Sequence, residues 1–295
     1  MTAATMVQQR SRLALTLRYM RRNLALTAGL FLLVLLTAFT VIGLLVIDPS
    51  DAYPLSVRPR QPPSWQFPFG TDFFGRDLFA AMVVGTWQTA FIGVLAGGLG
   101  TMIGVILGFT SAYFAGWTDA SVRSVCQILI PIPAILIQIV IVGSLDPRDV
   151  TIVTLAIIIV LLGWMGPTLV IRAQVLTMKE RQFVAVAKLS GVGNTGIIFK
   201  EIFPNLLPFV AAALVGQVFM AVFASFYLAV LGLGPLREPL LGNIIWSAQS
   251  QGAFFNGWWW WPIGPSIMLI LILATLSLIN MGLDELANPR VRKTE

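Results

Sequence analysis

Six long stretches of this chain contain no Asp, Glu, Lys or Arg, and no other feature limits its fold as strongly. Each stretch is long enough to cross about 30 Å of hydrocarbon at about 1.5 Å per residue. Irregular backbone finds no hydrogen-bond partners in lipid, so each stretch is expected to be a helix. The predicted spans are residues 24–47, 87–115, 124–143, 150–170, 206–231 and 262–283. With 57% hydrophobic and only 11% charged residues, the chain is predicted to be an all-α integral membrane protein with six transmembrane helices.

The distribution of Lys and Arg predicts the orientation of these helices, because basic residues gather in cytoplasmic segments. If the N-terminus is cytoplasmic, 14 basic residues lie inside and 5 lie outside. The inside set is Arg10, Arg12, Arg18, Arg21, Arg22, Arg123, Arg172, Lys179, Arg181, Lys188, Lys200, Arg290, Arg292 and Lys293, and the outside set is Arg58, Arg60, Arg76, Arg148 and Arg237. We therefore predict a multi-pass protein of the plasma or inner membrane with both termini in the cytoplasm. Anionic lipid accounts for the net charge of +6, so no nucleic-acid partner is expected.

The chain lacks the sequence motifs of common catalytic and metal sites. It contains no His, and its single cysteine, Cys126, lies in the third predicted span and cannot form an internal disulfide. The motifs GxxxxGK[ST], HExxH and GxSxG are absent. We predict that the chain is not an enzyme and has no catalytic or metal-ligating residue. The predicted spans contain no ionisable group of the kind that binds a coupling ion, which counts against an ion-coupled carrier or channel without removing that alternative.

One polar segment, residues 181–205, lies between two very hydrophobic ones. Helical spacing predicts a short amphipathic helix that stops at Gly191, followed by a turn at Gly193 and Asn194. A second helix is predicted to start behind Asn194 or Thr195 and to end at Pro204. The apolar residues expected on one side of the two helices are Phe183, Val184 and Ala187, then Ile197, Ile198, Phe199, Ile202 and Phe203. The segment is thus predicted to be a helical hairpin, with an ordinary amphipathic helix on the membrane surface as the alternative.

The loop after the first predicted span, residues 48–85, contains the run FPFGTDFFGRDLF at positions 67–79. Asp72, Arg76 and Asp77 are predicted to form a small ionic cluster. Gly70 and Gly75 permit the tight backbone that closes it. A capped surface helix with scattered charges is the alternative.

Residues 181–205 resemble the cytoplasmic coupling motif of ABC importer permeases, which reads Glu-Ala-Ala, three residues, Gly, and Pro thirteen residues later. Ala187, Gly191 and Pro204 match this pattern, whereas Ala185 replaces its Glu and Val186 its first Ala. The resemblance implies that the hairpin contacts an ATPase through Phe183, Ala185, Ala187, Gly191, Lys200, Glu201 and Pro204.

A second resemblance concerns the loop and the C-terminal part of the chain. The residues Gly70, Thr71, Asp72, Gly75, Arg76 and Asp77 resemble the Gly-Thr-Asp, two residues, Gly-Arg-Asp signature of the C-type permease subunits of oligopeptide, dipeptide and nickel importers. Residues 228–235 resemble the family's Leu-Ser-Phe-Leu-Gly-Leu-Gly motif, and Asn288, Pro289 and Arg290 resemble its closing Asp-Pro-Arg. The resemblance therefore covers nearly the whole chain.

Taken together, the resemblance implies a type I ABC importer permease that forms half of a translocation pathway. It implies an oligopeptide or dipeptide as cargo, with nickel or another metal complex as the alternative. The implied partners are a second, B-type permease, two cytoplasmic ATPase domains, an extracytoplasmic substrate-binding protein, the peptide and membrane lipid. ATP and Mg would be bound by the ATPase subunits, and no cofactor is expected on this chain.

Polar residues inside the predicted spans are candidates for lining the pathway, because lipid-facing positions disfavour them. They are Gln138, Gln217, Tyr227 and Asn280. Hydrogen bonding between helices is an equally good explanation for them. The run Trp258, Trp259, Trp260 and Trp261 is expected to anchor the outer membrane interface, with a ligand-stacking site as the alternative.

Two further patterns concern helix packing and the division of the chain. Small residues at every fourth position of the second span, from Ala96 to Gly116, predict a close helix contact, and Pro131 and Pro133 predict a kink in the third. We divide the chain into residues 1–85, with the basic arm, first helix and outer loop, and residues 86–295, a five-helix core that carries the hairpin.

Overall fold

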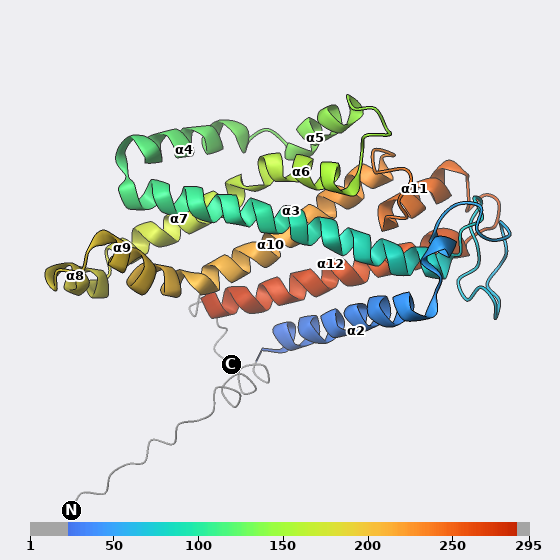
Figure 1. Ribbon diagram of the computed structural model, residues 1–295, viewed down its shortest axis with the longest axis horizontal. Coiled ribbons are helices and arrows are strands. Elements are labelled where there is room, and N and C mark those ends of the chain that lie inside the picture. The colour runs from blue at the N-terminus through green and yellow to red at the C-terminus, as the bar shows by residue number, and fades with distance from the viewer. Residues whose placement is uncertain (1–22, 288–295) are drawn as a thin grey trace, which may run out of the picture.

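The computed structural model describes residues 23–287, and this part of the chain folds into helices joined by loops (Figure 1). The helices that match predicted spans are α2 (Leu24–Val46), α3 (Leu78–Phe114), α4 (Gly116–Leu129), α5 (Ala134–Gly143), α6 (Ile152–Gly163), α7 (Met165–Lys179), α10 (Phe203–Val230) and α12 (Trp260–Ala287). Shorter elements are η1 (Pro49–Ala52), α8 (Gln182–Leu189), α9 (Asn194–Gly196), the π-helix η2 (Ile197–Ile202) and α11 (Leu241–Ser250). The basic residues before residue 23 and after residue 287, and the motif at Asn288, Pro289 and Arg290, lie outside the described residues.

The prediction of an all-helical membrane protein is confirmed. Four helical segments of the described chain are long and apolar enough to cross a membrane alone, and six spans result if two bent helix pairs each count as one. The pair α4 and α5 is bent by 77°, and the pair α6 and α7 by 43°. Pro131 and Pro133 lie in the break between α4 and α5, so the predicted kink is a sharp break in the helix.

Helix α3 begins earlier than the sequence suggested. Its N-cap is Asp77, whose side chain accepts a hydrogen bond from the Phe79 N–H at 2.9 Å. The helix therefore includes residues 78–85, which the sequence placed in the loop, and the expected division after residue 85 falls inside α3.

The helices form layers around α3 and α10 (Figure 1). Helix α3 packs along α7 and α10, and α12 packs between α10 and α2. The pair α4 and α5 lies on the side opposite to α2. We call the end that carries α8 and α9 the hairpin end, and the end that carries residues 48–77 and α11 the loop end.

Glycines on α3 explain why its neighbours approach so closely. A Cβ added to Gly104 would lie 2.6 Å from the Cβ of Pro167, and one added to Gly108 would lie 2.5 Å from the carbonyl oxygen of Thr168. Both contacts are with α7, so there is no room for a side chain between these helices. The predicted close contact is confirmed, and it is formed within this chain.

An ion pair holds the start of α4 against α7. The Arg172 guanidinium donates from Nε and Nη2 to the two carboxylate oxygens of Asp119, at 2.5 and 2.8 Å. This two-point geometry fixes orientation as well as distance. Beyond this contact α4 leans away from the bundle, as Figure 1 shows.

The tryptophan run behaves differently from the prediction of a uniform interface anchor. Trp261 is only 1% exposed and packs beneath the loop, whereas Trp259 is 56% exposed. The Trp260 indole N–H donates to the Thr71 carbonyl at 3.3 Å, and Trp258 lies beside Phe73. The interpretation as a membrane anchor is therefore wrong for the buried Trp261, whereas the half-buried Trp260 also bonds to the loop.

Candidate functional site

A hollow lined in part by polar side chains lies between α5, α6 and α10. This loop-end cavity has a volume of about 620 Å³ and is lined by three of the predicted pathway residues: Gln138, Gln217 and Tyr227. Gln138 is only 4% exposed, whereas Tyr227 is 42% exposed. The rest of the lining is apolar or glycine, including Ile159, Leu162, Gly163 and Phe223.

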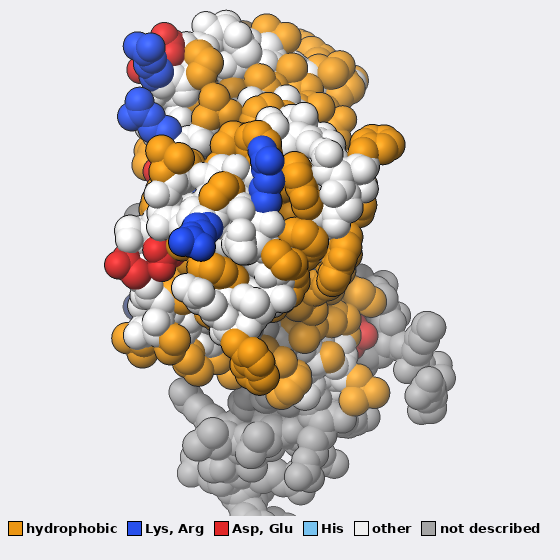
Figure 2. All heavy atoms as spheres, turned by 90° about the vertical axis from the view of Figure 1, so that its right-hand side faces the viewer, with side chains coloured by type: hydrophobic (Ala, Val, Ile, Leu, Met, Phe, Trp, Pro, Cys, Tyr) orange, Lys and Arg blue, Asp and Glu red, His pale blue; other side chains and the backbone are white. Residues whose placement is uncertain are grey.

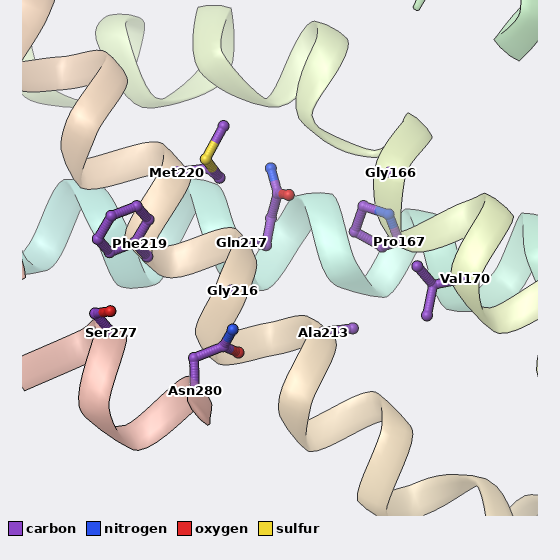
Figure 3. Close-up of a pocket in the computed structure, with 10 residues that line it drawn as sticks. All are labelled: Gly166, Pro167, Val170, Ala213, Gly216, Gln217, Phe219, Met220, Ser277 and Asn280. Carbon is purple, nitrogen blue, oxygen red and sulfur yellow. The ribbon is translucent and has the colours of Figure 1, made fainter. Parts of the chain in front are cut away.

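A second hollow adjoins the first and lies between α7, α10 and α12 (Figure 3). This hairpin-end cavity has a volume of about 380 Å³, and the fourth predicted residue, Asn280, lines it. Figure 3 shows the Asn280 amide directed toward α10 near Gly216, and Gln217 projecting from α10 on the side away from Asn280. Gln217 lines both cavities, so the structure places all four predicted residues around two adjoining cavities.

The chemistry of this region is that of neutral amides on apolar walls. None of the residues that line the two cavities is charged. The Asn280 Oδ1 atom is buried and has no hydrogen-bond partner among the described residues, while its Nδ2 group donates weakly to Asp284 at 3.4 Å. A free amide oxygen of this kind can accept a hydrogen bond from an amide N–H of a ligand. Because the lining is neutral, this hydrogen bond does not require the ligand to carry a charge.

The hairpin is the second candidate site, and its turn is built around Gly191. Helix α8 ends with two bonds typical of a Schellman motif: the Gly191 N–H donates to the Lys188 carbonyl at 3.0 Å, and the Val192 N–H donates to the Ala187 carbonyl at 3.1 Å. Gly191 has φ +78°, in the left-handed region that favours glycine. The predicted helix end at Gly191 is confirmed.

The inner face of the hairpin packs on the membrane helices. Val184, Ala187, Ile197 and Ile202 are buried in one cluster with residues of α3, α7 and α10. Burial of a Val or Ile side chain stabilises by about 1.5–3 kcal/mol, so this face holds the hairpin firmly. The opposite face carries exposed apolar residues, among them Leu189 at 89% and Phe199 at 68%.

The second half of the hairpin differs from the prediction in three respects. Gly193 takes the N-cap position instead of Asn194 or Thr195, and Phe199 is exposed instead of lying with Ile197 and Ile202. The helix does not end at Pro204, because this proline lies in the first turn of α10. Proline is tolerated there, since the N–H groups of a first turn have no partner within the helix.

The other predicted hairpin residues lie on its accessible side. Phe183, Ala185 and Lys200 are exposed, and Glu201 is half-buried. Ala185, at the position where the coupling motif has Glu, is exposed.

Polar contacts that the sequence did not reveal tie the hairpin to the end of α3. The Lys179 ammonium donates to the carbonyl oxygens of Ala112 and Tyr113, at 3.0 and 2.9 Å. A cation at a helix C-terminus is favourable because the last carbonyls lack helical partners. The Tyr113 hydroxyl in turn donates to Asn194 Oδ1 at 3.0 Å. These residues are far apart in the chain, so no local sequence pattern indicates the contacts.

The loop motif forms a compact cap at the loop end. Asp72, 1% exposed, accepts hydrogen bonds from the Phe74 and Arg76 N–H groups and pairs with Arg76 Nε at 2.6 Å. Arg76 also donates to Ser247 Oγ of α11 at 3.3 Å. Thr71 bridges to the loop start, because its hydroxyl donates to the Arg58 carbonyl and accepts from the Gln61 N–H. Figure 2 views this end and shows charged side chains scattered among apolar ones.

The predicted ionic cluster is confirmed for Asp72 and Arg76 and is wrong for Asp77. Asp77 caps α3 and forms no ion pair within the described residues. Burial, with a smaller contribution from the Asp51 charge, raises the pKa of Asp77. Gly70 and Gly75, at φ +74° and +75°, allow the tight loop as predicted.

The chain is similar in sequence and in fold to known membrane transport proteins. The profile of the family described as "Binding-protein-dependent transport system inner membrane component" matches residues 100–293. The chain is 28% identical to the dipeptide transport system permease protein of Bacillus subtilis, covering 94% of this chain and 85% of the relative. It is 29% identical to the oligopeptide transport system permease protein of Mycobacterium tuberculosis, covering 97% and 98%. An inward-facing structure of the MetNI methionine ABC transporter shares the fold, with a TM-score of 0.53 and 18% identity over 72% of this chain and 97% of that chain.

Proposed function

Because the chain belongs to the family of binding-protein-dependent transport system inner membrane components, we propose that it is a permease subunit of an ATP-driven importer of peptides. The observation that carries the proposal is the similarity, over nearly the whole chain, to permeases named for dipeptide and oligopeptide transport. The charge-free, amide-bearing cavities support it, because every peptide offers backbone amides regardless of its side chains.

In this proposal the two cavities form this chain's half of the pathway. Gln138, Gln217 and Asn280 offer hydrogen bonds to the backbone of a passing peptide, and the apolar walls accept its side chains. A carrier must bind its cargo loosely enough to release it. Neutral amides suit this need, since their hydrogen bonds are weaker than those to charged groups.

In this proposal, other subunits deliver the peptide, complete the pathway and hydrolyse ATP. A second, B-type permease completes the pathway, an extracytoplasmic protein delivers the peptide, and two ATPase domains bind ATP and Mg and hydrolyse the ATP. The exposed apolar face of the hairpin, with Leu189 and Phe199, supplies the contact with an ATPase. Apolar residues of this kind favour a protein contact when they cluster on a rigid element.

Uptake of a labelled dipeptide tests the proposal in cells of the native host. We expect a deletion strain to lose most of the uptake and a plasmid copy of this chain to restore it. Equal uptake in the deletion strain, with no competing dipeptide system active, would exclude the peptide function.

Topology offers an independent prediction. In a Cys126→Ala background, a cysteine at the exposed position Lys188 should stay unlabelled by an impermeant thiol reagent until the cells are permeabilised, because the hairpin is proposed to be cytoplasmic. A cysteine at the exposed position Arg237, at the opposite end, should be labelled in intact cells. Strong labelling of Lys188→Cys without permeabilisation would reverse the orientation.

A further inference from the structure

The two cavities meet at a narrow set of residues. Only Gly166, Gln217 and Met220 line both of them. Along α10, residues from Gln217 to Tyr227 line the loop-end cavity, and residues from Ala213 to Met220 line the hairpin-end cavity. Helix α10 runs from the hairpin end to the loop end, and Gln217 lies on α10 where the two cavities adjoin.

The wall opposite Gln217 is the break between α6 and α7. These helices are bent by 43° where Gly163 and Gly166 flank Trp164 and Met165. The Gln217 amide fills the space beside Gly163, since a Cβ added there would lie 2.6 Å from Gln217 Nε2. An added Cβ on Gly166 would meet nothing within 4 Å. The break therefore combines a helix bend, two residues without side chains and free space on one side.

No hydrogen bond within the described residues holds the Gln217 side chain in this position, and Met220 beside it has a flexible side chain. A small change in the bend between α6 and α7 would move Gly163 relative to the amide, and rotation of Gln217 would join the cavities. Glycines at a helix break suit such a movement, because they absorb changes of φ and ψ at low cost.

We propose that Gln217 is the gate between the two cavities and that the α6–α7 break at Gly163–Gly166 is the hinge that moves it. This inference rests on the proposed transport function and specifies where the pathway closes. The gate is a neutral amide, so it can hydrogen-bond a peptide backbone while it is displaced.

Cysteine accessibility tests the gate without any transported substrate. The complex is studied in inside-out vesicles, in a Cys126→Ala background, with a cysteine at Ala213 in the hairpin-end cavity or at Ala224 in the loop-end cavity. An impermeant thiol reagent should modify Ala213→Cys rapidly and Ala224→Cys slowly. Gln217→Ala should accelerate modification of Ala224→Cys by about tenfold, which corresponds to about 1.4 kcal/mol of barrier, and leave Ala213→Cys unchanged.

The exposed amide Gln249 on α11 provides the matched control, and Gln249→Ala should leave both rates unchanged. Equal rates at the two positions in the parent protein, or no acceleration by Gln217→Ala, would show that Gln217 is not a gate. Because the labelling needs no peptide, this result would be separate from a failure of peptide uptake.

A second variant tests the hinge. Gly163→Ala places a methyl group where Gln217 Nε2 now lies, and the flexible end of that side chain can move away. We expect Ala224→Cys to become more reactive, as in Gln217→Ala. Gly98→Ala is the control, because a Cβ there meets nothing within 4 Å. If Gly163→Ala assembles and leaves the reactivity of Ala224→Cys unchanged, the hinge assignment is wrong.

Discussion

Gly191→Val is expected to abolish most peptide uptake while the protein reaches the membrane at near-normal abundance. Gly191 has φ +78°, and an added Cβ would meet nothing within 4 Å, so the effect comes from backbone strain and not from collision. A residue with a side chain costs about 1–2 kcal/mol more in this conformation, and a branched one is least tolerated. The turn between α8 and α9 should change direction and displace the face that carries Leu189 and Phe199.

The neighbouring glycine provides the control. Gly193 has φ −67° and ψ 164°, which any residue adopts, and it too has free space around it. Gly193→Val should therefore retain uptake, and Gly191→Asn should retain more than Gly191→Val because Asn tolerates positive φ. The measurements are uptake and the ATPase activity of the reconstituted complex with and without loaded binding protein. Full stimulation in Gly191→Val would mean that the hairpin is a surface segment without a coupling role.

Arg76→Ala is expected to lower the amount of assembled complex strongly and equally for every peptide. Its side chain pairs with Asp72, and both are almost completely buried. Removal of one partner from a buried pair costs about 3–5 kcal/mol, because the other charge is left without compensation. The loop that joins α3, α11 and α12 should then lose its fixed structure.

Two comparisons make this prediction specific. Arg237→Ala removes an exposed arginine from the same end and should have little effect. The double variant Asp72→Asn with Arg76→Met should recover part of the assembly, since it leaves no unpaired charge. Assembly is measured as the amount of complex recovered through an affinity tag on this chain. Normal assembly together with a changed preference between acidic and basic peptides would instead assign Arg76 to substrate recognition.

The positions of the membrane helices could be predicted because charge-free stretches of this length have few alternatives in a bilayer. The ends of the helices were harder to predict. Residues 78–85 are apolar and suit either a buried loop or an extension of α3, and the cap at Asp77 decides between them. Likewise, Pro204 suits the position after a helix end or the first turn of a new helix. The sequence alone does not distinguish these two possibilities.

For the candidate site, too, the sequence indicates single residues but not the contacts between residues that are distant in the chain. Polar residues within apolar helices are visible in the sequence, and Gln138, Gln217, Tyr227 and Asn280 do line adjoining cavities. The pairing of Arg172 with Asp119, the contact between Lys179 and the end of α3, and the shared wall at Gly163 depend on how the helices pack. Such contacts between distant residues have no local pattern.

Peptide uptake by the complete complex in proteoliposomes tests the central claim most directly. The complex, purified through a tag on this chain with its partner subunits, is given labelled dipeptide, loaded binding protein and ATP. We predict uptake that requires hydrolysable ATP, that is lost in Gly191→Val and that persists when ion gradients are collapsed. Uptake that depends on an ion gradient and continues without ATP, or a complex that contains no ATPase chain, would contradict the assignment of this chain as an importer permease.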